Sequence, residues 1–177
     1  MPEFPKLEMG HIGVNVTDID RMTEFYRRVL GFTVTDGGRL RDMRLAFLSR
    51  DPGHHHQVVF VTGRPPGTVT TINQISFKVA TLGDLRIYHE ALLAEGVEGM
   101  DPVDHGNAWS VYFLDPEGNR LEVFMDTPWY VKQPKRETLD FALSDEEIHE
   151  ATIARFGDDE TFRPVEEWRD EVRKIIV

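Results

Sequence analysis

A chain of 177 residues with 40% hydrophobic residues can build a core, either as one domain or as two small packed halves. Its 31 acidic residues outnumber the 20 basic ones, and the formal net charge of −11 opposes binding to nucleic acid or to an anionic membrane surface. The chain has no cysteine, so disulfides and thiolate chemistry are excluded. Any metal must be held by imidazole, carboxylate or amide groups, which favour iron, manganese, zinc, nickel or magnesium.

The sequence also lacks the usual targeting signals. No apolar run is long enough to cross a membrane, and residues 1–5 show no basic stretch followed by an apolar one, as a secretory signal would. We therefore expect a cytoplasmic protein that does not interact with membranes.

The first half of the chain begins with a strand and a helix. Residues 9–16 alternate in the manner of a half-buried strand. Residues 18–31 place their apolar side chains on one helical stripe, which Thr17 or Asp18 can cap and Gly31 can end. Three more strands are predicted at residues 32–35, 44–49 and 57–62, with turns at residues 36–38 and 51–53. This half is therefore predicted to be a β-α-β-β-β unit.

The same order of elements returns in the second half, after a linker at residues 63–70 that is rich in proline and glycine. The predicted elements are a strand at residues 73–79, a helix at about 82–95, and strands at 98–100, 109–114 and 120–125. Asp115-Pro-Glu-Gly118 is expected to form the turn between the last two strands. The chain therefore carries a duplicated unit.

The character of the chain changes after residue 126. Ser144-Asp-Glu-Glu147 predicts a capping box at the start of one helix, and residues 162–172 suggest another. We expect paired modules over residues 1–126, at about 8–62 and 71–126, and an extended and helical tail over 127–177. The tail is interpreted as a packing or dimerisation appendage of a homodimer.

Candidate metal ligands lie at matching places in the two units. His11 opens the first strand of the first unit, Gln74 opens the second unit, and Glu122 lies on the last strand. An imidazole, an amide oxygen and a carboxylate are all metal ligands, so a metal site between the two units is one hypothesis. The alternative is structural, since a lone histidine on a strand is commonly just a half-buried polar residue and a glutamine can hydrogen-bond a neighbour.

The paired β-α-β-β-β units, the His11-Ile-Gly-Val14 start and the closing Asp115-Pro-Glu-Gly-Asn-Arg-Leu-Glu122 resemble the vicinal oxygen chelate superfamily. This group includes glyoxalase I, extradiol ring-cleaving dioxygenases, and fosfomycin-resistance and bleomycin-binding proteins. The resemblance covers about residues 8–126. It implies an α+β fold in which two βαβββ modules form an open eight-stranded cup, here with a helical C-terminal extension. It also implies a divalent metal that chelates two neighbouring oxygens of a substrate, but no single reaction.

The resemblance assigns metal ligation to His11, Gln74 and Glu122. Extradiol dioxygenases resemble this set with two histidines and one glutamate, so Gln74 replaces an imidazole with a weaker neutral donor. A glyoxalase site would need a carboxylate within residues 57–62, where the chain has none.

The resemblance also suggests roles around the metal. His105 corresponds to an acid or base, and Tyr112 to a residue that hydrogen-bonds a substrate oxygen. His56 lies on a loop that has three consecutive histidines, and it could approach the substrate, replace the missing ligand or simply line a solvated rim. Phe60 and Trp109 suit a flat apolar ligand, although core packing explains them equally well.

We therefore expect a metal-dependent oxidoreductase that is most similar to single-domain extradiol dioxygenases and serves the catabolism of aromatic compounds. Its substrates would be a catechol-type diol and dioxygen. Its metal would be Fe(II), with manganese, zinc or nickel as alternatives. Two other functions stay open: a glyoxalase-type metal-dependent isomerase or lyase, and a metal-free protein of the same fold that binds a small molecule. The glutamine at position 74 favours the metal-free alternative.

Overall fold

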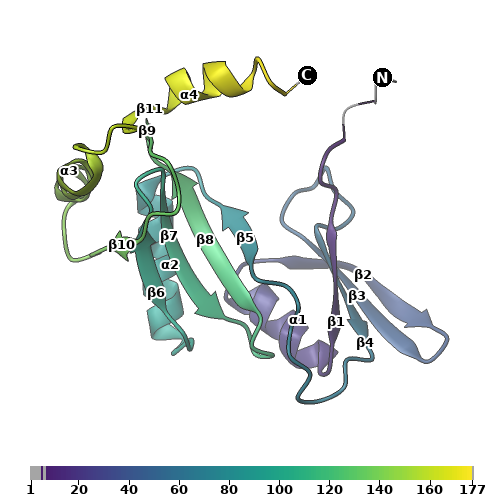
Figure 1. Cartoon of the computed structure of the whole chain (residues 1–177). Helices are drawn as coiled ribbons and strands as arrows, with labels where there is room; N and C mark the ends of the chain where they lie inside the picture. Colours follow the sequence, from purple (N-terminus) through teal and green to yellow (C-terminus); the bar gives the residue numbers. More distant parts are fainter. Residues whose placement is uncertain (1–4, 6, 177) are drawn as a thin grey trace. The chain divides into compact units, whose positions relative to one another are not determined.

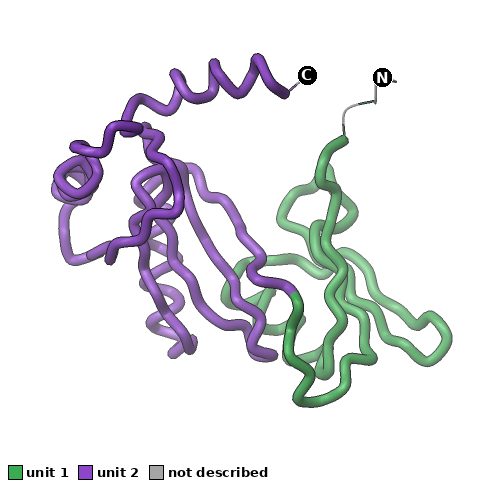
Figure 2. The backbone as a smooth tube through the Cα atoms, viewed as in Figure 1, with its two compact units in different colours: residues 1–71 green, residues 72–177 purple. Residues whose placement is uncertain are grey.

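The computed structural model describes residue 5 and residues 7–176. The chain divides into two compact units, residues 1–71 and residues 72–177 (Figure 2). Residues 1–4, which contributed to the expectation that no secretory signal is present, lie outside the described residues. Within the described residues, every helix is too short or too polar to span a membrane.

The first unit is one βαβββ module (Figure 1). Its elements are β1 (Ile12–Val16), α1 (Ile19–Arg28), β2 (Thr33–Leu40), β3 (Met43–Ser49) and β4 (Val58–Thr62). The sheet order is β1-β4-β3-β2, and only the β1–β4 pair is parallel. Asp18 caps α1 by accepting a hydrogen bond from the backbone N–H of Arg21. The predicted apolar stripe of this helix faces the core, where Tyr26 packs edge-on against Phe60 of β4.

The predicted turn at residues 36–38 is wrong, because β2 runs through it. The register shifts between Val34 and Asp36, and the β2–β3 hairpin turns only at Arg41, whose φ is 54°. Gly37 serves a close approach between strands, since a Cβ there would lie 3.2 Å from the carbonyl oxygen of Leu45. Glycine therefore marks a bulged strand here and not a chain reversal.

The second unit repeats the module with its own sheet. Its elements are β5 (Ile75–Lys78), α2 (Leu82–Ala94), β6 (Asp101–Asp104), β7 (Ala108–Leu114) and β8 (Arg120–Asp126), with β10 (Glu137–Thr138) added at one edge. The sheet order is β10-β6-β7-β8-β5, and only the β5–β8 pair is parallel. The predicted turn between β7 and β8 is confirmed, because the N–H of Gly118 donates to the carbonyl oxygen of Asp115 at 2.9 Å.

The short strand predicted at residues 98–100 is wrong by several positions. The carbonyl oxygen of Glu98 accepts one hydrogen bond from Leu114, but Gly99 follows with a φ of +71° and interrupts the pairing. The strand β6 therefore begins only at Asp101.

The tail adds α3 (Asp145–Phe156), α4 (Val165–Val172) and the short pair β9 (Trp129–Tyr130) and β11 (Arg163–Pro164). The capping box at Ser144 is confirmed. The helix α3 packs on the second module, where Trp109 donates its indole N–H to the hydroxyl of Thr152 at 2.9 Å. The α+β class, the two βαβββ modules and the helical extension are thus confirmed, and the domain boundary placed after residue 126 stays a prediction.

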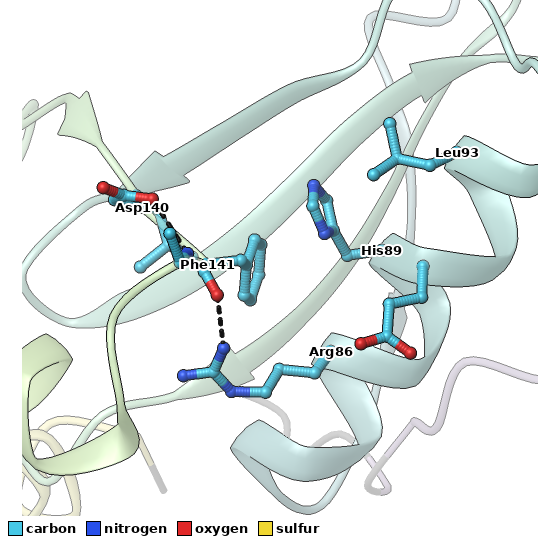
Figure 3. A pocket seen from close by; sticks show the side chains of 8 residues that line it. Arg86, His89, Leu93, Asp140 and Phe141 are labelled. Atoms are coloured by element: carbon cyan, nitrogen blue, oxygen red, sulfur yellow. Dashed lines mark hydrogen bonds between the residues drawn. The ribbon is translucent and has the colours of Figure 1, made fainter.

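A second contact joins α2 to the segment that precedes α3 (Figure 3). Arg86 donates from Nη1 to the carbonyl oxygen of Phe141 at 2.7 Å and pairs through Nε with Asp145 at 2.9 Å. The ring of His89 stacks on Phe141 with centroids 4.3 Å apart. Arg86, His89 and Phe141 line a hollow of about 360 Å³. Because the guanidinium of Arg86 is already bound to the tail, we interpret this hollow as part of the packing between α2 and the tail.

The stacked imidazole makes this packing sensitive to acid. Burial lowers the pKa of His89, Glu90 raises it in part, and Arg86 lowers it again. A depressed pKa in the folded state contributes stability above the unfolded pKa of about 6.5, and this contribution is lost as the pH falls through the folded value. Between pH 7.5 and 5, the free energy of unfolding of the wild type should fall more than that of His89→Phe, and by a small amount because the ring is only partly buried. Chemical denaturation at several pH values checks this, and parallel curves for the two proteins would contradict it.

Candidate active site

The carboxylate of Glu122 is the centre of a polar cluster in the second unit. Glu122 lies on β8 between Leu121 and Val123, which strand alternation sends to the opposite face, and it is 6% exposed. The parallel register places it beside Ser76 of β5. Its Oε2 accepts hydrogen bonds from Ser76 Oγ at 2.5 Å and from Gln74 Nε2 at 2.9 Å.

This carboxylate has no cationic partner among the described residues, since its hydrogen-bond partners Ser76, Gln74 and Tyr112 are all neutral. The nearby guanidinium of Arg120 lies over the ring of Tyr112, 4.0 Å from its centroid, and pairs with Asp101. A buried charge with only neutral partners carries a desolvation cost that a bound cation would relieve. The environment of Glu122 therefore fits a metal ligand better than a purely structural residue.

Tyr112 and His105 extend the cluster away from Glu122. Tyr112 lies on β7 directly opposite Glu122 and is 6% exposed. Burial first, and then the hydrogen bond and charge of Glu122, raise the pKa of Tyr112 to about 12, although Arg120 opposes the shift. Its hydroxyl lies 3.0 Å from Nε2 of His105. Tyr112 therefore stays protonated at neutral pH and can donate a hydrogen bond.

The structure brings four of the predicted site residues together in this unit: Gln74, His105, Tyr112 and Glu122. The carboxylate of Glu122, the phenol of Tyr112 and the imidazole of His105 lie one after another in space, and a proton can move along such a path. Sequence reasoning missed Ser76, although it shares a strand face with Gln74 two positions earlier, which is the signal that could have identified it.

The remaining predicted polar residues lie in the first unit. His11 directly precedes β1, and its ring centroid lies 4.2 Å from that of His56, which directly precedes Gln57 and β4. Parallel pairing of β1 with β4 causes this proximity. Nδ1 of His56 is also 3.0 Å from Nδ1 of His55. Burial, followed by the charges of His11 and His55, lowers the pKa of His56. The first unit therefore presents a pair of imidazoles, His11 and His56.

The two predicted aromatic contacts are core residues in this structure. Phe60 and Trp109 are both 0% exposed. Phe60 packs on Tyr26, and Trp109 lies against His149 of α3. Their role in substrate binding stays a prediction.

No group of three or more histidine and acidic side chains is gathered in a metal-binding arrangement within the described part of the chain. The predicted ligand set of His11, Gln74 and Glu122 also stays a prediction. The donor types themselves, imidazole with carboxylate, suit iron and the other borderline divalent metals.

Comparison with known proteins places the fold in a family. The sequence pattern of the Glyoxalase/Bleomycin resistance protein/Dioxygenase superfamily matches residues 8–123. The chain belongs to this superfamily. The match covers both βαβββ modules and stops within β8, just beyond Glu122, so the C-terminal tail lies outside it.

Two curated relatives of this superfamily member come from Rhodococcus globerulus. Biphenyl-2,3-diol 1,2-dioxygenase 3 is 32% identical over 67% of this chain and 63% of the relative. Biphenyl-2,3-diol 1,2-dioxygenase 2 is 29% identical over 71% of this chain and 65% of the relative. The chain thus spans just under two thirds of the length of either protein.

A solved structure is similar in fold. The glyoxylase/bleomycin resistance protein/dioxygenase domain from Frankia sp. EAN1pec aligns with a TM-score of 0.61 and 22% identity. The alignment covers 70% of this chain and 100% of that domain. At this identity the similarity shows the shared fold alone.

Proposed function

We propose that this superfamily member is a metal-dependent extradiol-type dioxygenase, an oxidoreductase that cleaves the ring of a catechol-type diol with dioxygen. The observation that carries the proposal is the buried carboxylate of Glu122, which has only neutral partners and lies beside the Tyr112–His105 pair. The two relatives named as biphenyl-2,3-diol dioxygenases support the same choice of substrate class.

The proposed ligands are His11, Gln74 and Glu122, and the proposed metal is Fe(II). Gln74 uses its amide nitrogen to hold Glu122 and Ser76, which leaves Oε1 as its ligand atom. When bound, the metal would supply a chelation point for the two neighbouring oxygens of the diol and for dioxygen. Gln74 contributes no charge and little basicity, so Glu122 carries most of the electrostatic attraction for the cation.

The residues around Glu122 handle protons in this proposal. The Tyr112 hydroxyl, held neutral by its raised pKa, donates its one hydrogen to Nε2 of His105 and accepts a hydrogen bond from a hydroxyl of the diol. His105 accepts the proton that the diol releases, and Tyr112 connects the two groups through its hydroxyl 3.0 Å from Nε2. The first unit contributes His56 as a proposed contact for the substrate ring, next to His11.

The test is oxygen uptake by the full chain, purified anaerobically and loaded with Fe(II), with biphenyl-2,3-diol as the probe substrate. We expect one dioxygen consumed per diol and a ring-opened product by mass spectrometry. Protein loaded with zinc and protein treated with a chelator serve as controls. Turnover without oxygen would replace the proposal with the isomerase or lyase function. Diol binding without turnover, unaffected by chelators, would indicate the metal-free binding protein.

A further inference from the structure

The C-terminal tail contacts His105 directly. Nδ1 of His105 lies 2.6 Å from the backbone carbonyl oxygen of Lys135, and Nε2 lies 3.0 Å from the hydroxyl of Tyr112. The two ring nitrogens therefore have different partners, one from the tail and one from β7. The family match includes His105 but ends before residue 135, so only the tail partner of this contact lies outside it.

The chemistry of these partners fixes the position of the ring proton. A carbonyl oxygen can only accept a hydrogen bond, so Nδ1 of His105 must carry a hydrogen. In the neutral imidazole Nε2 then has a free lone pair and faces Tyr112 as an acceptor. The carbonyl oxygen of Lys135 thereby selects the tautomer that can take a proton at Nε2.

Gln133 holds that carbonyl in place by linking the tail to the loop that carries His105. Its Nε2 donates to the carbonyl oxygen of His105 at 2.8 Å and to Oδ1 of Asn107 at 3.0 Å. Its Oε1 accepts from the backbone N–H of Lys135 at 2.9 Å. One amide thus bonds to the backbone of both residues that form the Nδ1 contact.

The side chain of Lys135 is held by a second interaction. Its ammonium group pairs with Asp159 at 2.5 Å, and the pairing helps to hold the pKa of that carboxyl well below its usual range. Asp159 also accepts from the backbone N–H and the hydroxyl of Thr161. The residue that carries the carbonyl is therefore restrained through both its backbone N–H and its side chain.

We propose that Gln133 is a positioning residue which, through the backbone carbonyl of Lys135, keeps neutral His105 in the Nδ1–H tautomer with Nε2 directed at Tyr112. The catalytic meaning of this tautomer rests on the proposed function, because only there does His105 accept a proton. The tail is then part of the active site and not only a packing appendage.

The test measures the tautomer of His105 directly and does not depend on enzyme activity. Metal-free protein comprising the full chain and labelled with ¹⁵N-histidine is compared with Gln133→Ala by NMR of the ring nitrogens at about pH 9, where histidine side chains are ordinarily neutral. Lys132→Ala provides a neighbouring exposed control. We expect wild type and Lys132→Ala to show Nδ1–H for His105, and Gln133→Ala to move substantially to Nε2–H. If Gln133→Ala does not fold, Gln133→Glu serves instead, since it loses the donor to His105 and keeps the acceptor for Lys135.

Two results would overturn the proposal: Nε2–H in the wild type, or an unchanged Nδ1–H in the folded Gln133 variant. If the protein also oxidises the probe diol, Gln133→Ala should lower kcat about 10-fold with KM little changed and should alter the pH profile of kcat. A tautomer that responds as expected in a protein without oxygenase activity would refute the proposed function and leave the positioning role standing.

Discussion

Glu122→Gln is expected to lower the affinity for Fe(II) by more than about 100-fold, beyond the 10–100-fold range typical of residues that only support a ligand. The amide removes the one negative charge of the cluster while keeping its shape and its contact with Ser76 and Gln74. The measurement is metal content by elemental analysis after anaerobic purification, followed by a binding titration.

The same substitution should weaken metal binding without destabilising the metal-free protein. Because it removes a buried charge that only neutral groups solvate, the free energy of unfolding without metal should stay constant or rise by about 1 kcal/mol.

Ser76→Ala should weaken metal binding about 10-fold, as expected for a supporting hydrogen bond. Glu98→Gln, which removes a charge from an exposed site, should leave metal binding unchanged. Stoichiometric iron in Glu122→Gln would show that Glu122 is not a ligand.

His105→Ala is expected to lower kcat for oxygen uptake with biphenyl-2,3-diol by about 10² to 10⁴-fold, the usual contribution of a positioned acid or base. Metal content should be unaffected, because His105 contacts Tyr112 and the tail but not Glu122. Steady-state kinetics on iron-loaded protein measure the effect. His54→Ala, at an exposed loop position, is the matched control and should keep the wild-type rate.

Tyr112→Phe tests whether the imidazole works through the phenol. If the two act as one unit, the double variant should be little slower than His105→Ala alone, since a shared step can be lost only once. Multiplicative losses would show that the two residues act independently, and a wild-type rate in His105→Ala would remove this histidine from the mechanism.

Local signals were sufficient for much of the fold. The apolar stripe of α1, its Asp18 cap and the capping box at Ser144 are set by residues close in sequence, and each predicts the observed helix. The Asp115 turn is equally local. The errors at residues 36–38 and 98–100 arose because glycine can serve a bulge, a close approach or a turn, and only the pairing partner decides which.

The positions of the site residues were predictable where they follow from the alternation of side chains along a strand. Glu122 and Tyr112 face each other because β7 and β8 form an antiparallel pair, which their spacing around a tight turn requires. The contact between His105 and Lys135 joins segments far apart in the sequence and uses a backbone atom, so no pattern of side chains could indicate it. Ser76 was missed because a serine on a strand is too common to stand out.

The parallel pairs β1–β4 and β5–β8 place the first and last strands of each module side by side. The His11–His56 pair and the Gln74–Glu122 pair are therefore each completed by the folding of a single module. The two pairs are not copies of one another, because Glu122 lies opposite Ser76 in the β5–β8 ladder, and the equivalent pairing in the β1–β4 ladder joins Gly13 to Val59. A substitution at His11 or His56 therefore leaves the Gln74–Glu122 contact in place, and a substitution at Gln74 leaves the imidazole pair in place. The donor atoms of the two pairs can therefore be changed one module at a time.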